Sequence, residues 1–390
     1  MSELHVLHTA DLHLGKNRRY SDYLTQQKWM LEGIIDQVKN KLLEVPSNDK
    51  VWLAVAGDIF DRNKDTKIEE FSLFLMEFVK PLIRLLSEYA NLEIYMIDGN
   101  HDRQTNAECP SLLYPFLNFL PERFYLASVD VKFIEHSKVL LAPFNGLSEN
   151  TLISLVKQYE PKFLVAHECL ARMVTDTGYE PPRDQDKYVE INNVMDEAPE
   201  LSAIFLGDIH KNQCLDNNKI CWYSGSPITL DFGHYLPKGI LHHKFENDVL
   251  ISSNLIPLKN KFIKYHKVLG ILDDVDSLPL EDIAEYKNRY LQCLVTPEVY
   301  QKINSMYPSF FFSPEVSWEY KKEKLNIKQA VKDKTEENST EESTETEESL
   351  TNTYYETMLL KWIIENLNHL LKDEQTECFD RLIKIFKKRG

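Results

Sequence analysis

The chain has 390 residues, of which 43% are hydrophobic and 27% are charged. This composition is typical of a globular protein and excludes a mostly disordered, collagen-like or membrane-embedded chain, and the length predicts more than one domain. The formal net charge of −16 argues against a protein that binds nucleic acid by overall electrostatic attraction.

Residues 1–255 alternate short apolar runs with longer stretches of helical periodicity, which predicts one layered α/β domain. The predicted strands are apolar runs bounded by Gly, Asp, Asn or Pro, at residues 4–9, 51–56, 92–97, 139–142, 163–166, 203–206 and 220–223. The spacing of apolar residues predicts helices at 26–43 and 68–89, with a kink in the second at Pro81.

Three further segments follow this domain. Residues 256–325 are predicted to form a small α+β domain, with strands at 262–272, 291–296 and 310–318 and helices at 280–290 and 297–307. Residues 326–352 are rich in Glu, Ser and Thr, and residues 332–350 hold eight acids and two lysines. Such a segment cannot bury enough apolar surface to fold, so we expect a flexible acidic linker, with a solvated charged helix as the alternative.

Residues 353–390 carry two amphipathic helical stripes. Two short helices cannot bury their apolar faces alone. They either dock on the main domain or bind another protein as helices in a groove, and the preceding tether favours the second interpretation.

Cysteine usage and the N-terminal sequence indicate the compartment. The six cysteines show neither a CxxC pair nor the spacing of a secreted scaffold. The N-terminus lacks the pattern of a signal peptide, and no uncharged apolar stretch is long enough to cross a bilayer. We therefore expect reduced thiols and a cytoplasmic location, in the cytoplasm of a host cell if the protein is encoded by a phage.

Five of the apolar runs are followed by polar residues of metal-binding types. These residues are Asp11, His13, Asp58, Asp61, Asn100, His101, His167, Asp208 and His210. Because functional groups in α/β sheets gather at the carboxyl ends of strands, we expect these side chains to converge. Carboxylate, imidazole and amide ligands without thiolates suit an ion such as Mn²⁺. Asp58 is a central carboxylate able to bridge two ions about 3.5–4 Å apart, the spacing used in hydrolysis of phosphate esters.

Each of these motifs taken singly is more typical of a turn or a helix cap. Their occurrence in order, each at a predicted strand end, favours the metal site. The remaining histidines lack this context and are predicted to be surface or packing residues. They are His5, His8, His136, His234, His242, His243, His266 and His369.

The motif order D-x-H, G-D-x-x-D, G-N-H-D, H and G-x-x-H resembles that of the calcineurin-like metallophosphoesterase superfamily. Within it, the chain is most similar to SbcD-type nucleases of DNA double-strand breaks, including phage-encoded recombination endonuclease subunits. That narrower similarity rests on H-T-A-D-L-H-L-G at 8–15, A-G-D-I-F-D at 56–61 and Y-S-G-S-P at 223–227. The resemblance implies an α-β-β-α sandwich, a small capping domain and a C-terminal helical pair on a flexible linker.

The resemblance also implies two bound Mn²⁺ ions, with Mg²⁺ as an alternative. One ion would be held by Asp11, His13, Asp58 and His210, and the second by Asp58, Asn100, His167 and the residue at 208. His101 would orient the scissile phosphate or protonate the leaving oxygen.

Two positions depart from the family pattern. The family has G-H-x-H where this chain has Asp208, and we hypothesise that Asp208 still binds the second ion, with one more negative charge. Asp61 stands where some relatives carry a second histidine, and we assign it to loop structure or to support of a neighbouring ligand at the catalytic site.

DNA contact is predicted from basic residues around the motifs. Lys16, Arg18 and Arg19 follow the first motif, and a basic track could continue through Arg103, Arg183, Lys259, Lys261, Lys264 and Lys267. The alternative is that these are solvated loop charges.

The resemblance further implies a homodimer and a partner protein. The matching dimer segments are 68–89 and 111–119, whose apolarity equally fits an ordinary core. An SbcC-type coiled-coil ATPase would bind residues 353–390. Because the chain has no G-x-x-x-x-G-K-[ST] motif, ATP hydrolysis would come from that partner.

The sequence thus predicts an Mn²⁺-dependent DNA exonuclease and endonuclease, the nuclease subunit of an SbcC–SbcD-type complex that processes double-strand breaks in repair, recombination or replication. One alternative is a phosphatase or small-molecule phosphodiesterase on the same scaffold. Another is a catalytically weakened DNA-end-binding scaffold in which Asp208 has disabled the second ion.

Overall fold

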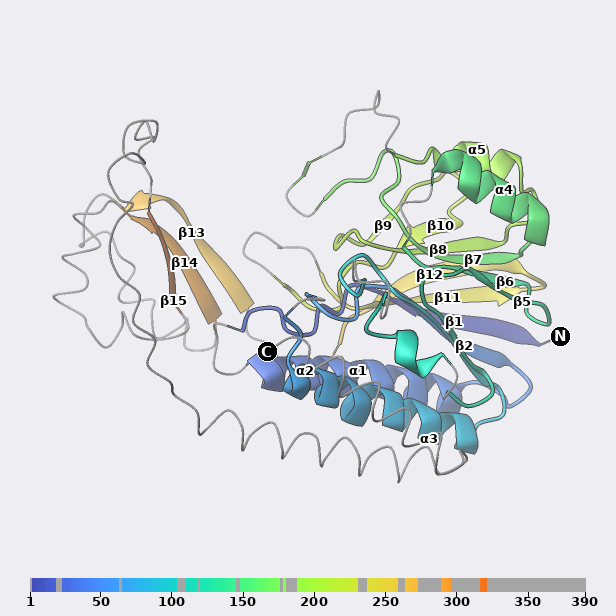
Figure 1. Cartoon of the computed structure of the whole chain (residues 1–390), viewed down its shortest axis with the longest axis horizontal. Coiled ribbons are helices and arrows are strands. Elements are labelled where there is room, and N and C mark those ends of the chain that lie inside the picture. The colour runs from blue at the N-terminus through green and yellow to red at the C-terminus, as the bar shows by residue number, and fades with distance from the viewer. Residues whose placement is uncertain are drawn as a thin grey trace.

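The structure is a computed structural model with two six-stranded sheets packed face to face and helices on the outer faces (Figure 1). It describes residues 2–18, 23–62, 65–103, 110–117, 120–144, 148–175, 178–179, 188–230 and 237–258, and the backbone of three strands at 264–272, 289–295 and 316–320. This arrangement confirms the predicted layered α/β sandwich.

The first sheet has the order β12-β11-β1-β2-β3-β4. Its strands are β1 (Glu3–Thr9), β2 (Lys50–Ala56), β3 (Leu92–Ile97), β4 (Phe124–Ala127), β11 (Ile240–Glu246) and β12 (Val249–Ile256). Strands β1 to β4 are parallel, and β11 pairs antiparallel with β1 and β12. Helices α1 (Tyr23–Glu44), α2 (Ile68–Phe74) and α3 (Lys80–Glu88) cover the outer face of this sheet (Figure 1).

The second sheet has the order β5-β6-β7-β8-β10-β9. Its strands are β5 (Lys132–Ile134), β6 (Val139–Ala142), β7 (Phe163–His167), β8 (Ala203–Gly207), β9 (Gln213–Cys214) and β10 (Cys221–Tyr223). Strands β6, β7, β8 and β10 are parallel. Helices α4 (Glu149–Tyr159) and α5 (Ile191–Asp196) pack on its outer face.

Strands β1, β2 and β3 of the first sheet are largely buried on both faces, which explains their nearly continuous apolar sequences. Leu7 and Leu53 face the layer of α1 to α3. Val6, Trp52 and Phe163 face the space between the two sheets. Because successive side chains point to opposite faces of the sheet, each strand contributes residues to two cores.

The predicted helix at 68–89 contains an irregularity that begins before Pro81. A π-helical turn, Leu75–Val79, separates α2 from α3, and Pro81 is the second residue of α3. Proline lacks an N–H and clashes with the carbonyl four residues earlier. The wider turn, in which the N–H of Lys80 donates to the carbonyl of Leu75, accommodates it.

Several elements were not identified from the sequence, most clearly the β11–β12 hairpin. Its turn residues Asn247 and Asp248 both have positive φ, 51° and 65°, as two-residue hairpin turns require. No helix among the described residues combines the length and apolarity that crossing a bilayer would need.

Three described strands overlap those predicted for the small domain, the third only at residues 316–318. They are β13 (Lys264–Leu272), β14 (Arg289–Val295) and β15 (Val316–Tyr320), which pair as a parallel sheet. Strand β14 begins within the predicted helix at 280–290. The predicted helix at 297–307, the acidic linker at 326–352 and the helical pair at 353–390 lie outside the described residues, so the domain boundaries at 255, 325 and 352 stay predictions.

Two histidines are packed inside the sandwich. His8 on β1 and His243 on β11 are fully buried, and their ring centroids are 5.7 Å apart. The Nε2 of His8 lies 3.1 Å from the carbonyl oxygen of Leu206. Burial lowers the pKa of His8 to about 3, and burial together with His8 holds the pKa of His243 well below its ordinary value. Both are neutral packing residues, the role predicted for them.

The burial of these two neutral histidines predicts that the folded protein loses stability as the pH is lowered. A histidine in the unfolded chain titrates near pH 6.5, so below about pH 6.5 the unfolded state binds more protons and the free energy of unfolding falls as the pH is lowered. His8→Gln keeps a donor for Leu206 but cannot be protonated. Urea unfolding between about pH 6 and about pH 4.5 should show a pH slope smaller by up to about 1.4 kcal/mol per pH unit in this variant. An unchanged slope would contradict the prediction.

Candidate metal centre

Four candidate ligands lie in left-handed turns at the carboxyl ends of strands. Asp11 and His13 follow β1 with φ of 55° and 45°, Asp58 follows β2 with φ of 52°, and Asp208 follows β8 with φ of 96°. Non-glycine residues adopt this conformation rarely and at an energetic cost, which is commonly found at functional sites. The turns direct these side chains to one end of the sandwich.

Two glycines allow the loops to approach closely. A Cβ on Gly99 would lie 2.1 Å from Oδ1 of Asp58, and a Cβ on Gly207 would lie 1.9 Å from the carbonyl oxygen of Ala56. Any side chain at these positions would displace the loops. The G-N-H-D and G-D-x-H motifs therefore contain glycine because the backbone passes next to a ligand or a neighbouring strand.

A first cluster forms around His13. Its Nε2 lies 2.9 Å from Nε2 of His210 and 3.5 Å from Oδ2 of Asp58. Asp11, His13 and His210 each offer one ligand atom, and these three atoms lie within 4.8 Å of one another. These are the residues expected at the first ion.

A second cluster forms around His167. Its Nε2 lies 3.1 Å from Oδ1 of Asn100, 3.4 Å from Oδ1 of Asp58 and 3.7 Å from Oδ1 of Asp208. Asp58 thus presents one carboxylate oxygen to each cluster, which is the arrangement that a bridging ligand requires. The thiol of Cys169 donates to the other oxygen of Asp208.

The electrostatics of the two clusters fit divalent cations. Burial raises the pKa of Asp11 well above its usual value. Burial also raises the pKa of Asp58, but His167 and His13 outweigh it and hold that pKa below the ordinary range. Among the described residues, no group hydrogen-bonds to Oδ2 of Asp11, which is buried. A buried set of carboxylates with an unsatisfied oxygen fits a bound cation.

The two histidines have partners at their other ring nitrogens. Nδ1 of His167 hydrogen-bonds to the carbonyl oxygen of Ala56 at 2.7 Å, and Nδ1 of His13 lies at ion-pair distance, 3.2 Å, from Oδ1 of Asp61. Each contact leaves Nε2 facing the cluster, as for metal-bound histidines. Asp61 is itself 3.3 Å from Nζ of Lys16. Although burial raises the pKa of Asp61, His13 and Lys16 lower it to about 2.

Asp61 is therefore expected to affect metal affinity through His13. Replacement by alanine removes the partner of Nδ1, and loss of such a partner weakens metal binding about 10–100-fold. Calorimetric titration of Asp61→Ala with Mn²⁺ should show this loss. The matched control is Asp65→Ala, which removes an exposed carboxylate from the same loop. Equal affinities in the two variants would exclude an orienting role.

His101 and Asp102 join the turns that carry the ligands. The backbone N–H of His101 donates to Oδ1 of Asp58 at 3.0 Å, and its Nδ1 bonds to the carbonyl oxygen of Asp61. Asp102 is fully buried and accepts the backbone N–H groups of three residues, which are Ile59, Phe60 and Gly99. The sequence reasoning gave Asp102 no role, although it completes the G-N-H-D motif.

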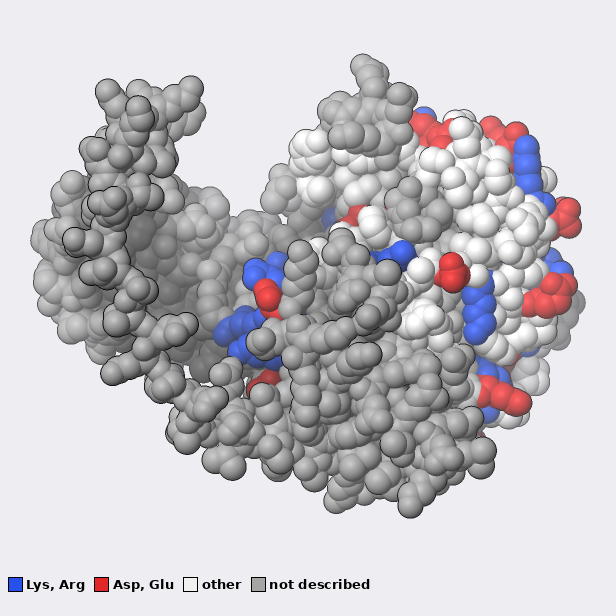
Figure 2. All heavy atoms as spheres, viewed as in Figure 1, with Lys and Arg blue, Asp and Glu red and all other residues white. Residues whose placement is uncertain are grey.

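The predicted DNA-contact residues have varied surroundings. Arg18 forms a bidentate ion pair with the buried Glu70, at 2.5 and 2.6 Å, and Arg103 donates to the carbonyl oxygen of Phe144. Figure 2 shows Lys and Arg side chains in small groups beside Asp and Glu on the face viewed. Arg19, Arg183, Lys259 and Lys261 lie outside the described residues, as do the side chains of Lys264 and Lys267. A basic DNA track stays a prediction.

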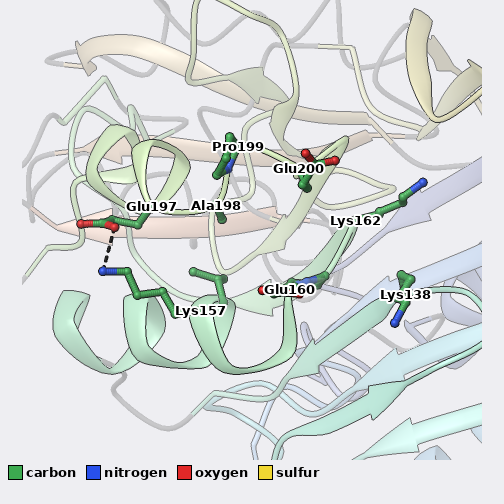
Figure 3. Close-up of a pocket in the computed structure, with 10 residues that line it drawn as sticks. Lys138, Lys157, Glu160, Lys162, Glu197, Ala198, Pro199 and Glu200 are labelled. Carbon is green, nitrogen blue, oxygen red and sulfur yellow. Dashed lines mark ion pairs between the residues drawn. The ribbon is translucent and has the colours of Figure 1, made fainter.

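A cavity of about 370 Å³ lies elsewhere, next to the loops that precede β7 and β8 (Figure 3). Lys157 and Glu197 point toward each other in an ion pair of 2.7 Å, and Lys138 and Lys162 extend away from this pair. The loops that carry the candidate ligands follow these strands, so the cavity is at the opposite end of the sheet.

Comparisons with known proteins agree with this geometry. The family model for calcineurin-like phosphoesterases matches residues 4–212, just over half of the chain. The SbcD component of the SbcCD nuclease of Staphylococcus epidermidis is 24% identical over 342 residues, which cover 81% of this chain and 86% of that protein. The DNA double-strand break repair protein Mre11 of Methanosarcina acetivorans is 25% identical over 347 residues.

The chain spans different shares of its relatives. The match to the Methanosarcina protein covers 85% of this chain and 50% of that protein. The protein R555 of Acanthamoeba polyphaga mimivirus is 25% identical over 274 residues, which cover 66% of this chain and 18% of that much longer protein.

Proposed function

The chain belongs to the calcineurin-like phosphoesterase family, and from this premise we propose that it hydrolyses phosphodiester bonds of DNA with two Mn²⁺ ions, or Mg²⁺ in their place. The observation that carries the proposal is the convergence of the two histidine-centred clusters on the two oxygens of Asp58. The names of the staphylococcal and archaeal relatives support DNA as the substrate.

We assign the first ion to Asp11, His13, Asp58 and His210, and the second to Asp58, Asn100, His167 and Asp208. When bound, the ions would lower the pKa of a water molecule and neutralise charge on the phosphoryl group. Asp58 would hold the ions at a fixed separation, and Asn100 and Asp208 would complete the second set of oxygen donors.

His101 acts on the leaving group in this proposal. Its Nδ1 is fixed by the carbonyl oxygen of Asp61, so Nε2 is the atom available to a substrate. From there it would protonate the departing 3′-oxygen or orient the scissile phosphate. The proposed reaction gives both exonuclease and endonuclease cleavage.

The proposed setting is a complex that processes double-strand breaks. Residues 353–390 would bind an SbcC-type coiled-coil ATPase, and the segments 68–89 and 111–119 would form a homodimer. The described parts of those two segments also contribute Phe71, Phe74 and Phe116 to the core beneath the first sheet. Cys169, Cys214 and Cys221 have free thiols, which supports the proposed cytoplasmic location.

The deciding experiment compares two substrates with each metal ion. Purified full-length protein should cleave linear duplex DNA with Mn²⁺ and should hydrolyse a chromogenic phosphomonoester far more slowly. Preference for the monoester would favour a phosphatase. DNA binding without cleavage, with and without the ATPase partner, would favour an end-binding scaffold. Cleavage that needs neither Mn²⁺ nor Mg²⁺ would overturn the metal assignment.

A further inference from the structure

A second group of metal-binding side chains lies at the amino end of β1. Glu3, His5 and Asp49 each offer one ligand atom, and these three atoms lie within 4.8 Å of one another. Glu3 and His5 belong to β1, and Asp49 belongs to the loop between α1 and β2. The candidate catalytic ligands follow the opposite end of β1, whose seven residues span roughly 20 Å. The two groups are therefore separate.

His5 has the features of a metal ligand. It is 6% exposed, and among the described residues no group hydrogen-bonds to its buried Nε2. This atom faces Oε2 of Glu3 at 3.4 Å. Its Nδ1 lies 3.0 Å from Nε2 of His242 on β11, and the two rings are stacked. If Nδ1 of His5 donates in this contact, Nε2 carries the lone pair that a metal ion binds.

The carboxylates retain oxygens for a ligand. Oε1 of Glu3 lies 2.8 Å from Nζ of Lys244, so Oε2 remains on the side of His5. Oδ1 of Asp49 accepts the backbone N–H of Glu3 at 2.9 Å, which holds the loop against the strand and leaves Oδ2 for a further partner. Each carboxylate is therefore held in place through one oxygen, and its other oxygen is available to bind a metal ion.

The net charge of the surroundings is suited to a divalent ion. Lys244 is also paired with Glu246 at 3.3 Å, and Lys41 in the last turn of α1 is paired with Glu44 at 2.8 Å. The four carboxylates Glu3, Glu44, Asp49 and Glu246 exceed the two lysines by two negative charges.

We infer that Glu3, His5 and Asp49 bind a divalent transition-metal ion such as Zn²⁺, with His242 orienting the His5 ring. One imidazole and two carboxylates are ligands that Zn²⁺ accepts, with water in a fourth position. The ion would join the first strand, the α1–β2 loop and, through His242, strand β11. The sequence prediction of His5 as a surface or packing residue would then be incomplete.

The test measures Zn²⁺ binding in the presence of excess Mn²⁺. Full-length wild-type protein, His5→Gln, Glu3→Gln and Glu246→Gln are dialysed against Zn²⁺, and bound metal is counted by mass spectrometry. We expect the wild type and Glu246→Gln to retain one Zn²⁺ more than His5→Gln and Glu3→Gln, whose affinity should fall by about 100-fold or more. Glu246→Gln is the matched control because it removes a carboxylate from the same lysine but no ligand.

A second measurement keeps the result independent of folding and of catalysis. With Mn²⁺ in excess, Zn²⁺ should raise the Tm of the wild type and of Glu246→Gln by more than it raises that of His5→Gln. Glu3 is partly exposed, so Glu3→Gln gives the same test should His5→Gln fail to fold. DNA cleavage with Mn²⁺ should be equal in all folded variants. The same Zn²⁺ stoichiometry and affinity in all four proteins would overturn the inference and leave a network of ion pairs.

Discussion

Replacement of Asp58 by asparagine is expected to lower Mn²⁺-dependent DNA cleavage by about a thousandfold or more, because a metal-bridging carboxylate contributes several kcal/mol to transition-state stabilisation. Asp58 faces His13 with one oxygen and His167 with the other. An amide offers only one oxygen and no charge. Single-turnover cleavage of linear duplex DNA, with Mn²⁺ affinity measured by calorimetry, would show the loss of both.

The asparagine variant should remain folded. Asp58 has a φ of 52°, and asparagine tolerates this left-handed conformation better than most residues. Its amide oxygen can still accept the N–H of His101. Asp130→Asn, at an exposed position between β4 and β5, is the matched control and should cleave at the wild-type rate. Cleavage by Asp58→Asn within tenfold of the wild type would contradict the bridging role.

The convergence of the candidate ligands could be predicted from the sequence because each motif is local. Asp11, Asp58 and Asp208 each follow an apolar run within a few residues, so a strand end and its ligand are visible together. Parallel pairing then brings the carboxyl ends of β1, β2 and β3 to one edge. The convergence follows from sheet topology, which the pattern of alternating strands and helices already indicates.

The roles that the sequence did not indicate depend on contacts between distant segments. Asp102 accepts N–H groups from the turn after β2, a partnership that no local pattern encodes. Arg18 looked like a phosphate contact because it is basic and follows the first motif, yet its guanidinium pairs with Glu70, 52 residues later. Charge and spacing identify candidates, but only the tertiary partner shows how a charged group is engaged.

The same limit applies to backbone irregularities. Pro81 correctly indicated a departure from a regular helix, but the sequence could not show that the wider turn spans Leu75–Val79. The β11–β12 hairpin was missed because its strands mix polar and apolar residues and because β12 is the edge strand of the described first sheet, beyond β11. Edge strands carry a weaker apolar signal than strands buried on both faces.

His101→Ala is expected to lower kcat for DNA cleavage by about 10²–10⁴-fold, the usual contribution of a general acid. Metal affinity should change little, because the contact of residue 101 with Asp58 is made by its backbone N–H, which alanine retains. His136→Ala is the matched control, since the side chain of His136 is 48% exposed and pairs with Glu93. Single-turnover rates and calorimetric Mn²⁺ titrations of both variants test the prediction.

A change of leaving group separates the two roles considered for His101. A phosphodiester with a p-nitrophenolate leaving group departs without a proton, so a variant that lacks only the general acid should recover most of its activity on that substrate. A variant that has lost phosphate orientation should be equally impaired on both substrates, because positioning is needed whatever group departs. The contact of Nδ1 with the carbonyl oxygen of Asp61 places one ring proton on Nδ1, so Nε2 can supply a proton from the doubly protonated ring, and we expect the first result.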